Sequence, residues 1–140
     1  VNYLSVLFNK LNRYSNLIAI FSPITWEFKD KKETFFFTIN DLTKKQFFIK
    51  NPGVQGSNMF FKSHILKDLN GFDETLMSAT DRDLIIRFID YLQKESLFDN
   101  VKILNNSYVF YNATNSNSIT NNKEKKHMGL DRFYLKYKAK

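Results

Sequence analysis

The chain has no cysteine and is poor in proline and glycine, with 2 prolines and 4 glycines among its 140 residues. Without cysteine it can form neither a disulfide framework nor a thiolate metal site, which is typical of a reducing compartment such as the cytoplasm. No hydrophobic run approaches the roughly 20 residues that a bilayer-spanning helix needs, so we expect no membrane span. The first residues carry charges inside an apolar pattern and show no small-residue cleavage site, so we expect no signal peptide there.

Aromatic residues and positive charge are abundant. The sequence contains 15 phenylalanines and 7 tyrosines, and its apolar share of 43% is enough to bury a core, which argues against a disordered chain. At this length we expect a single domain, residues 1–140, or a piece of one. A net charge of +7 is typical of proteins that bind nucleic acid, an anionic membrane surface or phosphorylated ligands, although solvated charged faces give the same excess.

The hydrophobic periodicity predicts helices alternating with short strands, and therefore an α/β fold. Apolar residues at i, i+3, i+4 and i+7 predict an amphipathic helix over Val1–Tyr14, with no capping residue before it. The polar turn Asp30–Lys32 predicts a hairpin. Ser63 is a suitable N-cap for a short helix, which Gly71 closes in the left-handed conformation. The predicted strands are Leu17–Phe21, Thr25–Phe28, Thr34–Ile39, Gly56–Lys62, Val101–Leu104 and Tyr108–Tyr111, and the other predicted helices are His64–Leu69, one from about Thr80 and Met128–Tyr137.

The helix near Thr80 begins with two acidic residues. Ser78 or Thr80 would cap it, and Asp81 and Asp83 lie in its first turn, where the helix dipole favours negative charge. Its core-facing stripe consists of Leu84, Ile85, Phe88, Ile89 and Leu92. A carboxylate beside a pocket can take a proton from a hydroxyl group, and the dipole keeps that carboxylate ionised but lowers its basicity.

The same residues also permit a purely structural interpretation, which is the commoner one for this spacing. Thr80 and Asp83 resemble a capping box with Asp in place of Glu, and Asp83 and Arg87 are spaced as an i, i+4 ion pair. Gly56 favours a binding site instead, because a small residue at a strand start lets a ligand approach the backbone closely.

The segment from Gly56 to Phe88 resembles the C-terminal half of family 2 glycosyltransferases of the GT-A fold. The family pattern has a small-residue strand start, an aromatic strand, a short helix, Gly-Gly-Phe-Asp-Glu, then Glu-Asp-x-Asp-Leu and an Arg one turn later. The corresponding residues are Gly56-Ser57, Met59-Phe60-Phe61, Ser63 to Leu69, Asn70 to Glu74, Thr80 to Leu84, and Arg87. The resemblance implies a partial GT-A-like mixed sheet flanked by helices, without the N-terminal nucleotide-binding βα units.

The resemblance also implies a reaction, the inverting transfer of a sugar from a nucleotide-sugar to an acceptor hydroxyl. Asp81 falls on the family's catalytic base, and Asp83 would hold the helix start or the loop. The implied substrate-binding residues are Gln55, Gly56, Ser57, Thr80 and Asp83. Thr80 stands where the family usually has Glu, so we expect the acceptor contacts to differ.

Metal binding departs from the family pattern. Asn112, a poor oxygen donor, stands near the place where the family often has a metal-binding His. The family's Asp-x-Asp, which binds diphosphate and a divalent metal (Mn or Mg), has no counterpart upstream, because Asp30 and Asp41 are isolated. We therefore expect the chain to be the acceptor-side part of a longer transferase and to be inactive alone. Its partners would be a nucleotide-sugar, a sugar or glycan acceptor and the missing N-terminal half, and an apolar flank exposed there would also allow a homodimer.

A second hypothesis from a different class is a non-catalytic module that binds nucleic acid or another anionic polymer. Aromatic side chains interleaved with cations are what such a binder needs. The C-terminal segment supplies them as Tyr134, Lys136, Tyr137, Lys138 and Lys140. The same spacing is equally that of a docking helix, and no RNA-binding signature accompanies it.

Overall fold

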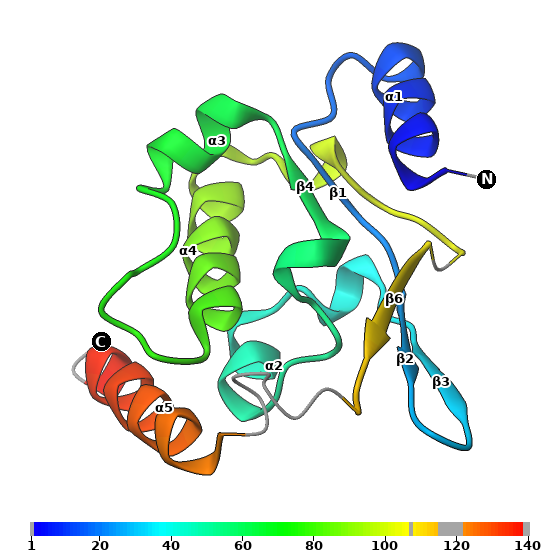
Figure 1. Ribbon diagram of the computed structural model, residues 1–140. Helices are drawn as coiled ribbons and strands as arrows, with labels where there is room; N and C mark the ends of the chain where they lie inside the picture. Colours follow the sequence, from blue (N-terminus) through cyan, green and yellow to red (C-terminus); the bar gives the residue numbers. More distant parts are fainter. Residues whose placement is uncertain (1, 107, 115–121, 139–140) are drawn as a thin grey trace.

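The computed structural model describes residues 2–106, 108–114 and 122–138 and shows an α/β fold with two small mixed sheets and surrounding helices (Figure 1). Its main elements are α1 (Tyr3–Arg13), β1 (Ala19–Phe21), β2 (Ile24–Glu27), β3 (Lys32–Phe35), α2 (Lys44–Ile49), β4 (Met59–Phe61), α3 (Ser63–Asp68), α4 (Thr80–Glu95), β5 (Val101–Ile103), β6 (Val109–Asn112) and α5 (Lys123–Lys138). Short 3-10 helices are η1 (Ile39–Asp41), η2 (Gly56–Asn58) and η3 (Phe98–Asn100). No described helix is long and apolar enough to cross a membrane.

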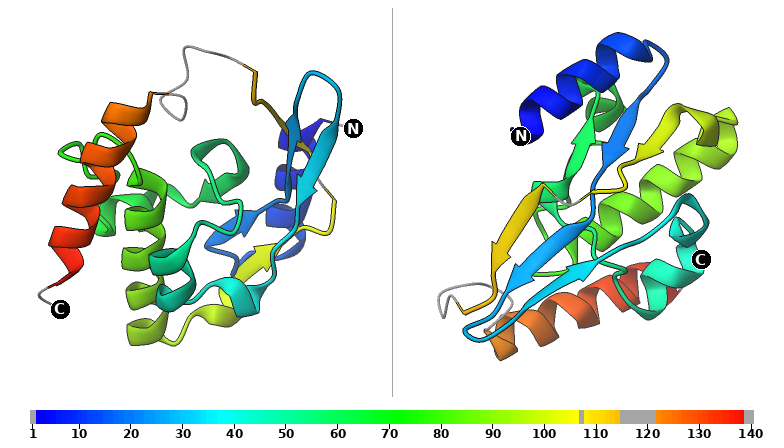
Figure 2. Two further views of the ribbon diagram at one scale, coloured as in Figure 1. Left: turned by 90° about the horizontal axis from the view of Figure 1, so that it is seen from below. Right: turned by 90° about the vertical axis from the view of Figure 1, so that its right-hand side faces the viewer.

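Each sheet has three strands and a mixture of directions. The first has the order β4-β1-β5, with β1 antiparallel to β4 and parallel to β5. The second has the order β3-β2-β6, with β2 antiparallel to β3 and parallel to β6. Only Ser22 and Pro23 separate β1 from β2, so one segment passes from the first sheet to the second (Figure 2). The predicted hairpin around Asp30–Lys32 is confirmed as the β2–β3 pair.

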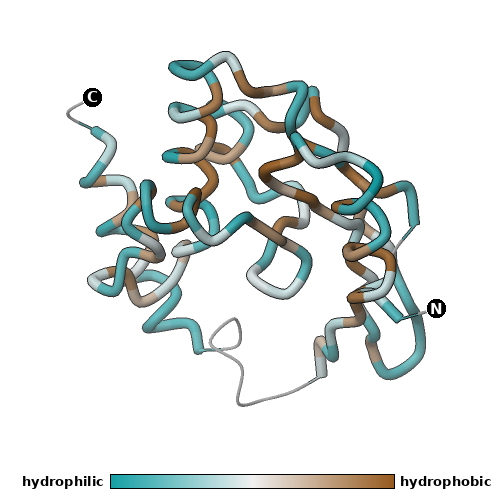
Figure 3. Tube along the Cα trace, turned by 90° about the horizontal axis from the view of Figure 1, so that it is seen from above, coloured by the Kyte–Doolittle hydropathy of each residue, from teal (hydrophilic) through white to brown (hydrophobic). Residues whose placement is uncertain are grey.

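Helix α4 carries the centre of the core, as its apolar stripe predicts. All five residues of the stripe are fully buried: Leu84, Ile85, Phe88, Ile89 and Leu92. Phe88 meets Phe61 edge to face, with ring centroids 4.9 Å apart, and Phe21 packs against both rings. Hydrophobic segments accordingly gather inside the molecule, while the outer turns are hydrophilic (Figure 3).

The prediction for the first helix is only partly right. Leu7 is buried in a second cluster with residues of β1 and the β5 end, but Leu4 and Phe8 are 68% and 64% exposed. Only one side of α1 contacts the rest of the chain. The apolar residues of the helix extend beyond that side, so some of them are exposed. Asn2 is the N-cap that sequence analysis missed, and its side chain accepts a hydrogen bond from the Leu4 amide at 3.0 Å.

Two predicted strands are longer than the strands that form. The strand expected over Gly56–Lys62 begins only at Met59, because residues 56–58 form η2. The strand expected over Thr34–Ile39 ends at Phe35, and Ile39 begins η1. Hydrophobic periodicity defines the ends of strands poorly, so the pattern predicts neither 3-10 turn.

Two predicted caps are also wrong. The N-cap of α3 is Lys62, with Ser63 as the first helical residue. The N-cap of α4 is neither Ser78 nor Thr80 but Ala79, which adopts a left-handed conformation with φ of 61° and makes no side-chain cap bond. A capping box of Thr80 and Asp83 is therefore not formed. The closing turn of α3 is confirmed in type, although Asn70 as well as Gly71 takes positive φ.

Candidate functional site

The candidate site lies where the loop 51–58 meets the first turn of α4. Two asparagine side chains shape this loop. Asn51 Oδ1 accepts hydrogen bonds from the amides of Gly53 and Val54, at 3.0 and 2.8 Å. Asn58 is fully buried: its amide group donates to the Ser22 and Gly53 carbonyls, at 2.7 and 2.9 Å, and its oxygen accepts from the Gln55 amide. Because these buried polar groups are satisfied, the loop is held in one conformation.

Gly53 fixes where the loop rests on the second sheet. Its φ of 112° disfavours any side chain, and an added Cβ would lie 2.9 Å from the Cβ of Phe35. Gly56, further along the loop, has no positive φ, and the nearest atom to its imagined Cβ is Asp81 Oδ1 at 3.7 Å. The loop therefore places the backbone of Gly56 directly beside the Asp81 carboxylate.

Asp81 is the sequence-predicted base, and its electrostatics differ from the expectation. It is half-buried, and this burial raises the pKa of its carboxyl from 3.8 to about 6. The backbone N–H of Gly56 donates to the carboxylate and lowers the pKa, but by less than burial raises it. The expectation that the helix dipole makes this group a weaker base is therefore wrong, because desolvation of the charged form dominates.

Asp83, two residues later, has the opposite surroundings. Its carboxylate is fully buried and accepts bonds from Arg87 Nε at 2.9 Å, Tyr137 Oη at 2.7 Å and Lys136 Nζ at 2.6 Å. The i, i+4 pair with Arg87 is thus confirmed. No surface of Asp83 is open to a substrate in this structure, and its role here is to join α4 to α5.

Arg87 carries the same network to the turn after α3. While paired with Asp83, its guanidinium donates to the backbone carbonyls of Leu69 and Gly71. Lys136 also pairs with Asp73 at 2.7 Å, and this bond lowers the pKa of the Asp73 carboxyl to about 2. Burial acts against the charge on Lys136, but its bonds to both carboxylates prevail and raise its pKa. These contacts fix the loop that leads into α4.

Helix α5 lies against this loop at very short range. An added Cβ on Gly129 would lie 2.3 Å from both the backbone nitrogen and the Oγ of Ser78, so glycine is required there. The Ser78 hydroxyl donates to the Lys126 carbonyl at 3.0 Å, and Arg132 donates to the Thr75 carbonyl at 2.8 Å. Sequence analysis missed Gly129, because nothing in the local sequence shows which segment it touches.

Arg82 is a second residue that sequence analysis did not single out. Although charged, it is only 9% exposed, and it donates from Nε to the Phe47 carbonyl at 2.7 Å. Its guanidinium carbon lies 4.6 Å from the ring centroid of Phe133. The side chain turns away from Asp81 and ties α2 and α5 to the start of α4.

The other predicted substrate residues lie on the two segments that form the site. Ser57 is exposed and Gln55 half-buried on the loop, while Thr80 is half-buried as the first residue of α4. These residues and Asp81 thus come from the loop and the helix start, whereas the resemblance implied a strand start at Gly56 and Ser57. Their contact with a substrate stays a prediction.

Asn112, the predicted metal ligand, does not fit that role in this conformation. Its Oδ1 already accepts bonds from the backbone nitrogen and hydroxyl of Thr114, at 3.0 and 2.6 Å. The described residues contain no group of three His, Cys, Asp or Glu side chains that could hold a metal. No step is therefore assigned to a metal on this chain.

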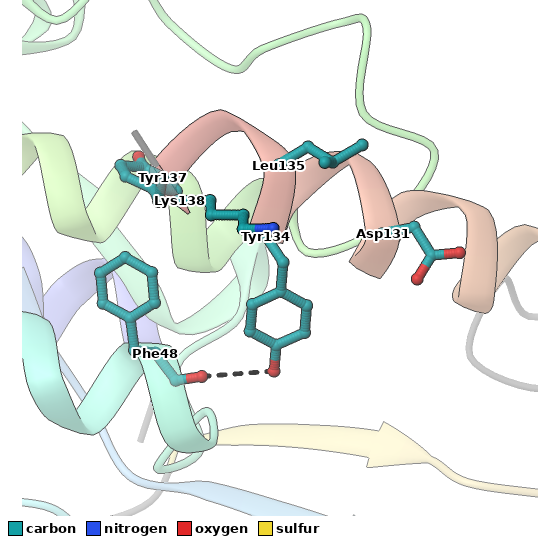
Figure 4. Close-up of a pocket in the computed structure, with 6 residues that line it drawn as sticks. All are labelled: Phe48, Asp131, Tyr134, Leu135, Tyr137 and Lys138. Atoms are coloured by element: carbon teal, nitrogen blue, oxygen red, sulfur yellow. Dashed lines mark hydrogen bonds between the residues drawn. The ribbon is translucent and has the colours of Figure 1, made fainter. Parts of the chain in front are cut away.

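Most of the aromatic and basic residues proposed for polymer binding already make contacts within the protein. Tyr137 is 9% exposed and bonded to Asp83, and Lys136 pairs with two carboxylates. Tyr134 is 46% exposed, but its hydroxyl points to the Phe48 carbonyl at 3.4 Å (Figure 4). Lys140 lies outside the described residues. An open hollow of about 640 Å³ beside α5 is lined by Phe48, Asp131, Tyr134, Leu135, Tyr137 and Lys138.

Comparison of the chain with protein-family profiles, with curated proteins and with solved structures finds no match. What the site can do must therefore be argued from its own geometry.

Proposed function

We propose that the chain is the acceptor-side part of an inverting glycosyltransferase in which Asp81 is the general base. The observation that carries this proposal is the state of Asp81 itself. A half-buried carboxylate at the start of a helix, with a pKa raised to about 6, makes one backbone contact and has no cationic partner among its described interactions. Asp83, only two residues away, is instead enclosed by three donors.

The proposed reaction is a single displacement at the anomeric carbon. Asp81 takes the proton of an acceptor hydroxyl, and the oxygen attacks the anomeric carbon of a nucleotide-sugar from the side opposite the leaving group. A new carbon–oxygen bond forms while the bond to the diphosphate breaks, and its electron pair leaves with the nucleoside diphosphate. The configuration of the anomeric carbon is inverted.

A pKa of about 6 suits this role. A general base works best when its pKa lies close to the operating pH, because it is then ionised and still basic enough to accept a proton. An ordinary exposed aspartate, with a pKa of about 3.9, would be a far weaker base. Burial of Asp81 thus makes it better suited to proton transfer, at some cost in stability.

The resemblance places the nucleotide-binding units and their metal upstream of this segment, so the test uses the longer transferase that we propose. Asp81→Asn keeps the size of the side chain and removes the basic oxygen, so transfer should fall by about 100-fold or more. Asp81→Glu is the matched control and should retain part of the activity. Transfer by Asp81→Asn at the wild-type rate would exclude Asp81 as the base.

Gly56 offers an independent test of access to the carboxylate. Its backbone is unstrained, and a side chain there would point at Asp81. Gly56→Ala should therefore leave transfer almost unchanged, while Gly56→Leu should fold normally but block the approach of the acceptor hydroxyl. Equal activity of the two variants would show that the acceptor does not pass this position.

A further inference from the structure

An aromatic face covers one side of the second sheet. In its register Trp26 of β2 lies opposite Tyr111 of β6, and their ring centroids are 5.1 Å apart. Phe35 of β3 and Phe28, just after β2, lie on the same side, with centroids 5.3 and 6.1 Å from that of Trp26. We call Trp26, Phe28, Phe35 and Tyr111 the Trp26 face. All four are half-buried, so their rings form surface as well as core.

The Trp26 face adjoins the candidate site through the loop 51–58. Gly53 rests on Phe35 and Ile24, the residue that precedes Trp26 on this side of β2. Three residues later the same loop places Gly56 beside Asp81. The loop therefore covers the end of the sheet at Ile24 and leaves the next pair, Trp26 and Tyr111, beyond its edge.

Packing alone does not explain a tryptophan at this position. Its indole Nε1 is enclosed but has no hydrogen-bond partner among the described residues, so phenylalanine would fill the place without leaving a donor unpaired. On the opposite side of the sheet Thr25 and Thr34 share a hydrogen bond of 2.9 Å, Lys32 pairs with Glu27, and Phe110 is an exposed aromatic residue. Four aromatic rings therefore gather on the side of Trp26, and one lies on the other side.

We propose that the Trp26 face is a subsite that stacks against a pyranose ring of the acceptor, whose reacting hydroxyl lies at Asp81. This inference rests on the function proposed above for Asp81. A pyranose presents C–H groups on its face and hydroxyls at its edge, so an aromatic surface binds the face while the hydroxyls stay in water. Mostly aromatic sites with a few polar groups are typical of small-molecule recognition. The proposal makes the acceptor a glycan or a glycoside.

The single tryptophan makes the subsite directly observable. We would titrate the protein with methyl β-glucoside, methyl β-galactoside, methyl α-mannoside and methyl N-acetyl-β-glucosaminide while recording Trp26 emission. At least one glycoside should change the emission in a saturable way. Tyr111→Leu should then raise the Kd roughly three- to tenfold, the effect of losing one aromatic stacking contact.

Phe110→Leu is the matched control. Phe110 is the neighbour of Tyr111 in β6, is 61% exposed and lies on the opposite side of the sheet, so its loss should leave the Kd unchanged. For Trp26 itself, binding is followed by saturation-transfer NMR. Trp26→Phe, which breaks no described hydrogen bond, should fold and still bind, whereas Trp26→Leu should lose binding. Circular dichroism checks that each variant is folded.

Absence of a saturable response to all four glycosides, or equal effects of Tyr111→Leu and Phe110→Leu, would overturn the subsite. Asp81→Asn separates this outcome from failure of the proposed function. It should abolish transfer in the longer enzyme yet retain glycoside binding, while Tyr111→Leu should raise the KM for the acceptor with little change in kcat. Unchanged transfer by Asp81→Asn would remove the function, and an unchanged KM in Tyr111→Leu would remove the subsite alone.

Discussion

Asp81 and Asp83 are identical side chains two positions apart, but their surroundings in the fold differ. Asp83 is enclosed by Arg87, Lys136 and Tyr137, which all donate to its carboxylate. The Asp81 carboxylate is half-buried and accepts one hydrogen bond, from the Gly56 amide. Burial outweighs that bond and raises the pKa of Asp81 to about 6. A spacing of two residues on a helix points the two side chains in different directions, so each meets a different neighbour.

The raised pKa of Asp81 predicts how stability depends on pH. The folded protein binds this proton more tightly than the unfolded chain, so the free energy of unfolding should decline as the pH rises from 3.8 to about 6. Asp81→Asn removes this penalty and should stabilise the protein at pH 7 by about 1–2 kcal/mol, allowing for solvent at a half-buried group. Urea denaturation at pH 7 and pH 4 measures the difference. A carboxylate that merely stabilises the helix start would instead make the variant less stable at pH 7.

Asp83→Asn should have the opposite effect. It leaves the cations of Arg87 and Lys136 beside a neutral amide in a buried place, and the cost of breaking a buried ion pair is about 3–5 kcal/mol. The expected result is a large loss of stability at neutral pH, measured by the same denaturation. Stability within experimental error of the wild type would show that the network contributes little, and the comparison with Asp81→Asn serves as its internal control.

Helices α4 and α5 meet through one small residue and a set of polar bonds. Gly129 allows the backbone of α5 to approach Ser78, and Lys136 and Tyr137 then reach Asp83. The same approach holds the segment before Ala79, whose left-handed conformation starts α4. The orientation of Asp81 therefore depends on how α5 docks.

Gly129→Ala should disturb this docking. The added methyl group would clash with the Ser78 backbone, which cannot move as a flexible side chain does, and overpacking of this kind costs about 1–3 kcal/mol. A fall in the melting temperature and faster amide exchange at the start of α4 would report it. Gly71→Ala is the control: the φ of Gly71 is positive but the space around it is open, so the variant should cost only the backbone strain, about 1 kcal/mol. A smaller effect at Gly129 than at Gly71 would contradict the tight contact.

At the scale of the whole molecule, the net charge of +7 and the aromatic content are used differently from what composition suggests. Part of the positive charge is internal, since Arg82, Arg87 and Lys136 bond to carbonyls or carboxylates within the protein. Many of the rings lie in the core or in the Trp26 face. The described surface therefore carries less of a polymer-binding pattern than the sequence of α5 alone indicates.

We accordingly expect weak, non-specific binding to nucleic acid. Fluorescence anisotropy with a single-stranded oligonucleotide should show binding that is lost as salt rises, because only screened charge attraction contributes. Tyr134→Ala, which removes the exposed ring of α5, should change this affinity little. Tight binding that persists at high salt and depends on Tyr134 would favour the binding-module hypothesis over sugar transfer.

Local features of the fold can be predicted from the amino-acid sequence. The period of the apolar residues in α4, the β2–β3 hairpin and the Asp83–Arg87 pair all depend on neighbours within a few positions. The sequence also indicated Gly56 and Asp81 as parts of one site; the two residues lie in contact, and their shared role in a site stays a prediction.

Features that depend on distant segments become visible only in the folded chain. The pKa of Asp81 follows from its burial in the folded chain, and the short contact between Gly129 and Ser78 follows from the docking of α5. The exposure of Leu4 and Phe8 likewise depends on what α1 packs against. Desolvation and steric fit arise from the whole surroundings of a residue, and periodicity along the chain carries no information about them.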